Sequence, residues 1–275
     1  MSNAGDIPVS LDGERFTVSA ERPEIARFWH KADSGRWEGD TLRFVRRHAG
    51  ADAVLVDIGA WIGPISLFAS RQMGHVLALE PDPVAHSELT YNVAANGLRN
   101  IDIWHAGIDA VAGTLDLYAA SGLGQSVTSA LGGQGFEKIT VRTVPFAEIT
   151  SALPKGARVA VKIDIEGHEY AIANHIIDFV REHNAPLHLS LHPGIYFRHR
   201  RERMGAYAAW HDTWSATRHL LSKLAALGPV THSRTGRRFT AATLAQHMLL
   251  NKKIKNFTVE VGGDPAAAVE PPTTS

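Results

Sequence analysis

The stretch VLVDIGAWIGP, residues 54–64, decides the fold of this chain. A short apolar run that ends in an acid and glycines predicts a buried parallel strand, then a tight turn and a helix. Gly59 lets the backbone come close to a ligand, and Pro64 suits the first turn of a helix. Asp57 is expected at the carboxyl end of the strand, where ligands bind in open α/β sheets.

The spacing within this turn favours an adenosyl cofactor over a dinucleotide. Dinucleotide sites use G-x-G-x-x-G, so that a pyrophosphate can rest on the helix N-terminus. Here Gly59 and Gly63 are four residues apart, and Trp61 stands where the middle glycine would be expected. The carboxylate of Asp57 accepts hydrogen bonds from hydroxyl or ammonium groups but repels phosphate. A strand, turn and helix that bind no ligand are the alternative interpretation.

Two further acids follow the next two predicted strands, residues 76–79 and 101–104. Glu80 comes 21 residues after Gly59, close to the offset of about 20 residues at which an acid reaches a ribose hydroxyl. A carboxylate suits that role because it accepts from both vicinal hydroxyls. Asp109, beyond the next strand, is expected either to accept the exocyclic amine of an adenine or to cap a turn.

The stretch VAVKIDIEGHE, residues 159–169, predicts another buried strand that ends in acids. Lys162, Asp164 and Glu166 share one face while strand geometry lasts. Charged groups on a central strand are costly unless they are solvated, paired or used, so the alternatives are a Lys162–Asp164 pair and a catalytic site. Residues 187–191 predict the neighbouring strand. His192 at its carboxyl end is placed for chemistry, whereas His188 is predicted to be a core histidine.

The remaining segments predict additions to this sheet. Strands at 114–118 and 139–144 flank the glycine-rich loop 121–135, and a loop of this length is either functional or merely mobile. Residues 1–50, with a strand at 16–18 and helices at 23–30 and 41–48, are expected to form a lid or to pack on the sheet edge. Asp40 is a candidate cap of the second helix.

The carboxyl-terminal third carries a basic cluster and an aromatic stripe. Residues 198–203 favour either an anionic substrate or lipid surface, or a solvated helix end. Residues 207–224 keep apolar groups at helical spacing, which predicts core or a dimer face. Residues 230–261 are expected to close the fold as an edge hairpin, and residues 262–275 predict a disordered tail.

Composition excludes several classes of protein. The formal net charge is zero and the hydrophobic content is 44%, which permits a sizeable core and gives no basic excess of the kind that nucleic-acid binding needs. Because there is no cysteine, disulfides, thiolate zinc sites and cysteine nucleophiles are excluded. No transmembrane run or signal peptide is recognised. We expect a soluble cytoplasmic protein without a nucleic-acid partner.

Three motifs together resemble the FkbM-type methyltransferases, a branch of the S-adenosylmethionine-dependent superfamily. They are DIGAWIGP (57–64), ALEPDP (78–83) with NVAANGL (92–98), and VKIDIEGHE (161–169). The resemblance implies a Rossmann-like α/β domain over residues 51–261, with a seven-stranded sheet whose last strand is antiparallel. It further implies S-adenosyl-L-methionine as cofactor, held by Asp57, Gly59, Ala60, Gly63, Glu80 and Asp109. The family commonly has asparagine where this chain has Trp61.

The resemblance implies methyl transfer, usually to a hydroxyl. The cofactor carries the reactivity and the protein supplies alignment, but a hydroxyl acceptor needs a base or a metal nearby. Asp164, Glu166 and His192 are the candidates for the base. Catechol-type O-methyltransferases bind a divalent cation at these strand ends, so Mg²⁺ is a candidate cofactor. We expect a small-molecule hydroxyl acceptor and consider a homodimer. The alternatives are an inactive cofactor-binding scaffold and a nicotinamide-dependent oxidoreductase.

Overall fold

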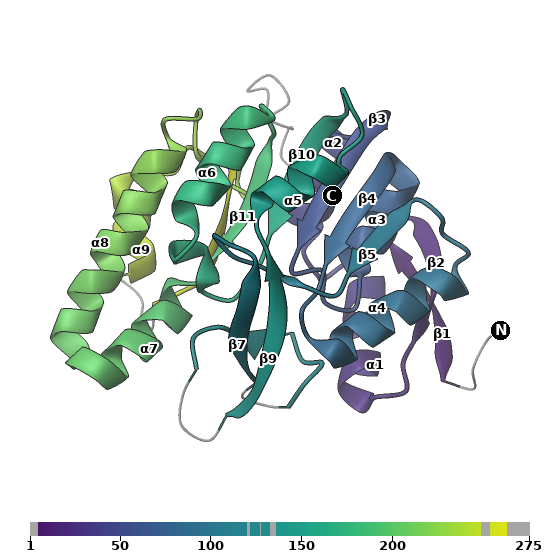
Figure 1. Cartoon of the computed structure of the whole chain (residues 1–275), viewed down its shortest axis with the longest axis horizontal. Coiled ribbons are helices and arrows are strands. Elements are labelled where there is room, and N and C mark those ends of the chain that lie inside the picture. The colour runs from purple at the N-terminus through teal and green to yellow at the C-terminus, as the bar shows by residue number, and fades with distance from the viewer. Residues whose placement is uncertain (1–4, 120–121, 127, 133–135, 249–253, 263–275) are drawn as a thin grey trace, which may run out of the picture.

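A seven-stranded sheet forms the centre of the protein (Figure 1). The structure is a computed structural model that describes residues 5–119, 122–126, 128–132, 136–248 and 254–262. The strands are β3 (Gly50–Ile58), β4 (Met73–Leu79), β5 (Ile101–Trp104), β10 (Arg158–Ile163), β11 (Leu187–Leu191), β12 (Thr231–His232) and β13 (Phe257–Val261). Their order is β12-β13-β11-β10-β3-β4-β5, and β13 runs antiparallel to both of its neighbours. The predicted sheet with an antiparallel last strand is confirmed. As predicted for residues 230–261, β12 and β13 form an antiparallel pair at the edge of the sheet, with β12 outermost.

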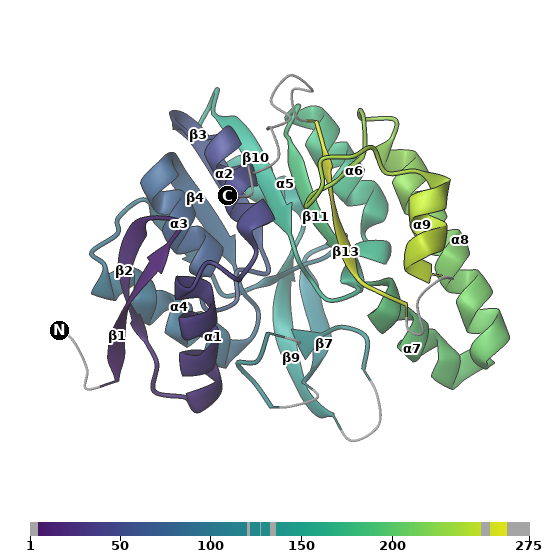
Figure 2. The same cartoon turned by 180° about the vertical axis from the view of Figure 1, so that it is seen from behind.

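Helices cover both faces of this sheet, because the central strands are apolar on both sides. One face packs on α5 (Phe146–Ala152), α6 (Ala173–Glu182), α8 (Ala206–Leu224) and α9 (Ala241–Met248). The other packs on α1 (Pro23–Asp33), α2 (Gly39–Arg47), α3 (Pro64–Gln72) and α4 (Pro83–Ala95). Figure 2 shows α1 and α2 on the side away from α5 and α6. The described part of the chain has no helix that is both long and apolar enough to cross a membrane.

The amino-terminal segment packs against α3 and α4. Its strands β1 (Asp6–Leu11) and β2 (Glu14–Ser19) form a separate hairpin, of which the sequence predicted only the second strand. Side-chain amides of α4 bind β2, since Asn92 Oδ1 accepts from the backbone of Ser19 at 2.9 Å. The prediction that Asp40 caps α2 is wrong. Glu38 holds that position, and Asp40 instead accepts a hydrogen bond from Ser233.

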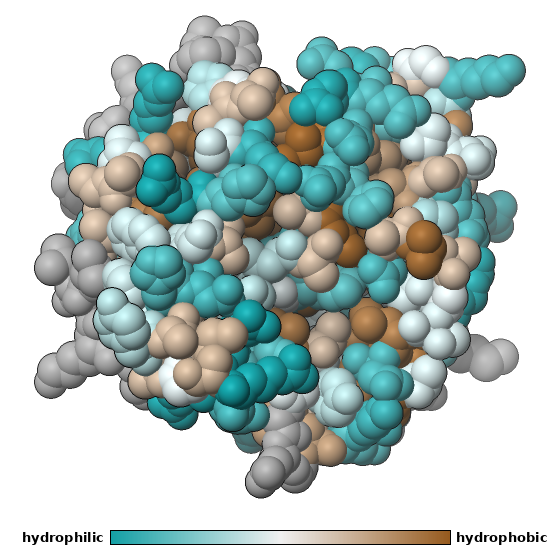
Figure 3. All heavy atoms as spheres, turned by 60° about the vertical axis from the view of Figure 1, so that its left-hand side comes forward, coloured by the Kyte–Doolittle hydropathy of each residue, from teal (hydrophilic) through white to brown (hydrophobic). Residues whose placement is uncertain are grey.

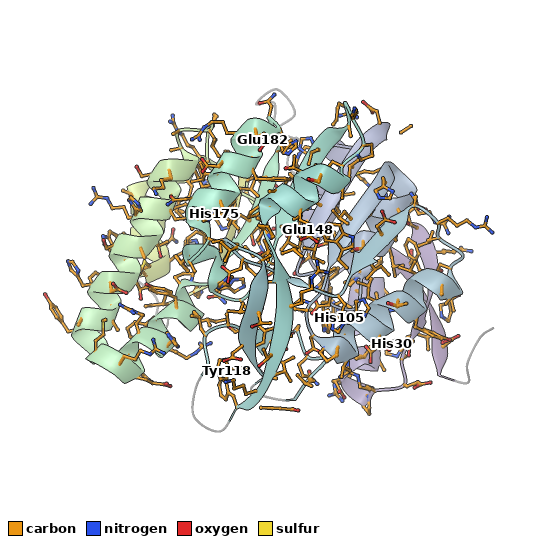
Figure 4. The ribbon with its side chains drawn as sticks, in the orientation of Figure 1. His30, His105, Tyr118, Glu148, His175 and Glu182 are labelled. Carbon is orange, nitrogen blue, oxygen red and sulfur yellow. The ribbon has the colours of Figure 1, made fainter. Side chains whose placement is uncertain are left out.

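A second sheet, of order β6-β9-β7-β8, is inserted between β5 and α5. Its main part is the antiparallel pair β7 (Gly113–Ala119) and β9 (Glu137–Val144), which confirms the two predicted strands. The short strands β6 (Gly107–Ile108) and β8 (Thr128–Ser129) flank this pair. The hairpin extends below the central sheet in Figure 1, and Figure 4 places Tyr118 near its far end.

The basic cluster 198–203 lies in the last half of a helix, α7 (Pro193–Met204), which agrees with the helix-end alternative, and α8 follows it directly. Within the predicted stripe of α8, Thr217 and Leu224 are buried but Tyr207 is 85% exposed. Figure 3, which brings this side forward, shows hydrophilic side chains interleaved with smaller apolar areas. A homodimer through this face stays a prediction. Of the predicted tail, residues 263–275 lie outside the described residues.

Candidate functional site

One cavity opens at the carboxyl ends of β3, β4 and β10. The strand order reverses between β3 and β10, and ligands bind at such a switch point in open α/β sheets. The space between its walls is about 580 Å³, part of which is open to solvent. Its floor comes from the central sheet, and its opposite wall from β7 and the glycine-rich loop. The lining includes Gly59, Trp61, Glu80, Gly107, Ile108, Leu115, Leu117, Gln125, Asp164, Glu166 and His168.

The turn after β3 brings two glycines into conformations that other residues avoid. Gly59 has φ +80°, and a Cβ there would lie 2.0 Å from the backbone oxygen of Asp164. Gly63 has φ +91°, and its Cβ would meet Leu89 at 2.4 Å. Of the predicted turn residues Gly59, Ala60 and Gly63, only Gly59 is part of the cavity lining. Ala60 is buried, and its N–H donates a hydrogen bond to the backbone oxygen of Leu79.

Glu80 lies in the cavity wall as a buried carboxylate held by backbone donors. Its Oε2 accepts from the N–H of Trp61 at 2.7 Å, and its Oε1 from the N–H of Asp82 at 2.8 Å. Burial raises the pKa of Glu80 to about 7, against these two hydrogen bonds, which lower it. Each oxygen keeps a second lone pair, so the group can accept from a pair of vicinal hydroxyls.

Asp57 lies behind the turn and outside the cavity lining. It is fully buried, with Oδ2 accepting from Ser66 Oγ at 2.6 Å and Oδ1 3.1 Å from Lys162 Nζ. Lys162 also donates to the backbone oxygen of Gly59 at 2.7 Å. Its direct ion pair is therefore with Asp57, and not with Asp164 as the structural alternative predicted. The Lys162–Asp57 pair therefore holds the turn in place through the backbone oxygen of Gly59.

The structure brings the three predicted catalytic residues together. His192 is the N-cap residue of α7. Its Nε2 lies 3.3 Å from Asp164 Oδ1 and 3.5 Å from Glu166 Oε2. Ligand atoms of all three residues lie within 4.8 Å of one another. Two carboxylates and an imidazole at this spacing form a donor set that can hold a divalent cation.

Glu169 is a functional candidate that the sequence did not single out. It is fully buried, and its Oε1 accepts from the N–H of His192 at 2.6 Å and lies 3.3 Å from the Nδ1 of that ring. Its Oε2 accepts from the N–H of Gly167 at 2.8 Å. Glu169 lies in a 3₁₀ turn, His168–Tyr170, at which its carboxylate is directed inward.

These contacts divide the charges of the cluster. Burial lowers the pKa of His192, but Glu169 and Asp164 outweigh burial and raise it well above its ordinary value. Burial raises the pKa of Asp164, yet its contacts with His192 bring it down to about 2. The attraction of His192 for Glu166 is too weak to offset burial, so burial raises the pKa of Glu166 to about 7. The cluster therefore contains an imidazolium, and Glu166 is the member that titrates near neutrality.

Asp109 follows β6 and not the central strand β5. Its Oδ1 accepts from the N–H of Ala110 at 2.7 Å and lies 3.5 Å from His168 Nε2. It is not part of the cavity lining, whereas the preceding Gly107 and Ile108 are. The turn contact that the sequence offered as an alternative is thus present in the structure.

The glycine-rich loop is held over the cavity at Gly124. The N–H of Gly124 donates to Asp82 Oδ2 at 2.7 Å, and its carbonyl accepts from Trp61 Nε1 at 3.0 Å and from Arg22 Nη2 at 2.9 Å. The Trp61 ring contacts Phe28 of α1, with 4.5 Å between ring centroids. The amino-terminal segment, the turn after β3 and the loop therefore meet at one point. Val127, in the same loop, lies outside the described residues.

Comparisons with known proteins point to methyltransferases. A family model described as the methyltransferase FkbM domain matches residues 57–198, just over half of the chain. No curated protein gives a significant match. One similar solved structure is the methyltransferase FkbM from Methylobacillus flagellatus, with 17% identity and a TM-score of 0.40, covering 76% of this chain and 44% of that one. This chain therefore spans less than half of that protein's length.

Two other similar structures come from different kinds of methylase. An rRNA methylase from Streptococcus thermophilus has 10% identity and a TM-score of 0.44, covering 80% of this chain and 92% of that one. The precorrin-6Y C5,15-methyltransferase from Geobacter metallireducens has 19% identity and a TM-score of 0.33, covering 63% of this chain and 66% of that one.

Proposed function

Because the chain belongs to the methyltransferase FkbM domain family, we propose that it transfers a methyl group from S-adenosyl-L-methionine to a hydroxyl of a small molecule. The observation that carries this proposal is one cavity that is lined by carboxylates at two places. Glu80 lies at the end of β4, and Asp164 and Glu166 follow β10.

The cavity suits a cationic nucleoside without phosphates. Its described lining includes three carboxylates and neither lysine nor arginine, so a pyrophosphate would be repelled. Beyond its 3.3 Å contact with His192 Nε2, Asp164 Oδ1 keeps a second lone pair, so it can also accept a hydrogen bond from a ligand. Glu80 would hold the ribose hydroxyls. Gly107 and Ile108, with Asp109 behind them, would flank the adenine.

We assign the proton transfer to Glu166. The cofactor supplies an electrophilic methyl group bound to a sulfonium sulfur. As the bond between the acceptor oxygen and the methyl carbon forms, the sulfur–carbon bond breaks and the hydroxyl proton passes to Glu166. A base with a pKa near the working pH is the most effective, and the pKa of Glu166 is raised to about 7. Asp164 stays ionised. His192, which Glu169 fixes, holds the carboxylates of Asp164 and Glu166 in place.

We propose that this cluster works without a metal ion. The Nε2 of His192 already contacts both Asp164 and Glu166, and its raised pKa makes it the cation between them. Mg²⁺ prefers a complete shell of oxygen ligands, which a buried imidazole does not favour. The divalent cation considered from the resemblance is therefore not part of the proposed mechanism.

Calorimetry and a product assay test the function. The protein should bind S-adenosylmethionine and not NAD, and it should release S-adenosylhomocysteine only when a hydroxyl compound from a panel of sugars and phenols is added. Asp164→Asn and Glu166→Gln should keep cofactor binding and lose turnover. Glu182→Gln is the control, because Glu182 is exposed on α6 (Figure 4). Binding without acceptor-dependent release would support the scaffold, and heat with NAD alone would support the oxidoreductase.

A further inference from the structure

A second cavity lies at the other edge of the central sheet, beside β12 and α9. It is open to solvent and has a volume of about 860 Å³. Its residues come from the turn after β12, from α9 and from the segment before β13: His232, Thr235, Arg237, Arg238, Thr243, Gln246, His247 and Lys255. None of them belongs to the cavity at the strand ends. Figure 2 shows α9 beside α8, away from the hairpin of β7 and β9 that covers the first cavity.

The charged residues that line this second cavity are all positive. Arg237, Arg238 and Lys255 contribute three permanent positive charges, and no lining residue is acidic. Within the part of the chain that the structure describes, none of these three side chains forms a salt bridge, whereas Arg47, Arg158 and Arg200 each do. Three like charges around one hollow repel one another, and an anion would relieve that repulsion.

The imidazoles of the cavity are held by a stack of rings. His232 and His247 are stacked with 5.6 Å between ring centroids, and Phe239 and Phe257 extend the stack. The Nδ1 atom of His247 is buried and has no hydrogen-bond partner among the described residues. Because His247 lines the cavity, the stack holds this ring rigidly beside the three cations, as a preorganised binding site requires.

We propose that this second cavity binds a phosphate-bearing small molecule. Two neighbouring guanidinium groups suit phosphate because each can donate two parallel hydrogen bonds to its oxygens. Lys255 adds a point charge, and the imidazoles add donors. A dianion or polyanion matches three cations better than a single carboxylate does. The proposal goes beyond methyl transfer, since no residue of the proposed catalytic cluster takes part.

The position of the cavity makes its ligand separate from the methyl acceptor. In the sheet order, β12 lies three strands from β10, which is about 14 Å at the usual strand spacing. A hydroxyl beside Glu166 and a phosphate beside Arg237 would therefore need a long molecule between them. The ligand that we infer is one that occupies the second cavity by itself.

Titration calorimetry with inorganic pyrophosphate tests the proposal on the full chain. Pyrophosphate should bind with one site per chain, equally in the presence and absence of saturating S-adenosylmethionine. Arg237→Ala and Arg238→Ala should each weaken binding at least about tenfold, as expected for one charge-assisted contact. Both side chains are exposed and make no contact in the described fold that folding depends on.

Arg234→Ala is the matched control. Arg234 is exposed on the same turn but does not line the cavity, so its loss removes the same charge and should change the affinity less than about twofold. An absence of heat with millimolar pyrophosphate would overturn the proposal, and so would an equal loss in all three variants. Competition between pyrophosphate and S-adenosylmethionine would also overturn it, because it would place the anion in the first cavity.

Discussion

The Nε2 of His192 lies 3.3 Å from Oδ1 of Asp164, so an imidazole at the end of β11 meets a carboxylate at the end of β10. The two strands are parallel neighbours in the sheet, and their carboxyl ends therefore present side chains to the same space. Burial in this space costs each charge its hydration, and only mutual pairing makes the arrangement stable. The predicted properties of the site follow from this pairing.

The rate of methyl transfer should rise with pH through about 7. Glu166, whose pKa burial raises to about 7, must be ionised to accept a proton, so the acid form below that pH is inactive. Glu166→Gln should lower kcat by about 10²–10⁴-fold, the usual contribution of a general base, and should abolish this limb of the pH–rate profile. If the rate of the variant still rises with pH through about 7, this pKa belongs to another group.

Chelation should leave the activity unchanged. His192 supplies the positive charge between Asp164 and Glu166, so removal of divalent cations takes nothing from the proposed cluster. Dialysis against EDTA followed by the product assay is the measurement, with added Mg²⁺ or Mn²⁺ as the second arm. Loss of turnover on chelation, with recovery on adding either ion, would show that a metal and not the imidazolium serves this function.

The same imidazolium should make folding stability depend on pH above neutrality. The pKa of His192 is raised in the folded protein, so its contribution is fully present below the unfolded value of about 6.5. That contribution is lost as the pH rises through the folded pKa. Urea unfolding between pH 6.5 and 9.5 should show a declining free energy of unfolding.

His192→Gln should flatten that decline and lower stability at pH 6.5 by about 3–5 kcal/mol, because it leaves buried carboxylates unpaired. His211→Gln, on the exposed side of α8, should keep the wild-type curve. An unchanged slope in His192→Gln would mean that other groups cause the decline.

Gly59 should not tolerate a side chain. Alanine in the left-handed region costs about 1–2 kcal/mol, and at Gly59 its Cβ would also lie 2.0 Å from the Asp164 backbone oxygen. Gly156 has nearly the same φ, +78°, with nothing within 4 Å of its Cβ position. Gly59→Ala should therefore lose about 1–3 kcal/mol more than Gly156→Ala in urea unfolding. It should also lose turnover, because it displaces Asp164. Equal losses of stability in the two variants would contradict the close approach of Gly59 to the backbone oxygen of Asp164.

The strands and the acids that end them could be predicted from sequence because each is a local pattern. The apolar runs before Asp57, Glu80 and Asp164 all form central strands. Strand register is not local, and for this reason the partner of Lys162 could not be predicted from the sequence. Residues two apart on a strand lie about 7 Å apart, whereas directly opposed residues of neighbouring strands are closer. Lys162 is paired with Asp57 in the register of β10 and β3.

Two other parts of the site depend on contacts between distant segments. In the sequence Glu169 looks like an ordinary helical residue. Only the position of α7 shows that its carboxylate accepts a hydrogen bond from the backbone N–H of His192. The contact of Trp61 with Gly124 joins residues 63 positions apart across a glycine-rich loop, whose conformation no propensity specifies. The sequence thus predicted the floor of the cavity better than its cover.

Trp61→Phe should loosen the glycine-rich loop over the cavity without changing the central sheet beneath it. Phenylalanine can keep the ring contact with Phe28, and the backbone N–H that donates to Glu80 remains, but the hydrogen bond from Nε1 to Gly124 is lost. One such bond contributes about 1 kcal/mol, so affinity for S-adenosylmethionine should fall about fivefold, and amide exchange over residues 122–126 should become faster. Trp210→Phe, on α8, should change neither quantity. If exchange in the loop stays at the wild-type rate while affinity falls, Trp61 acts on the cofactor through its ring and not by holding the loop.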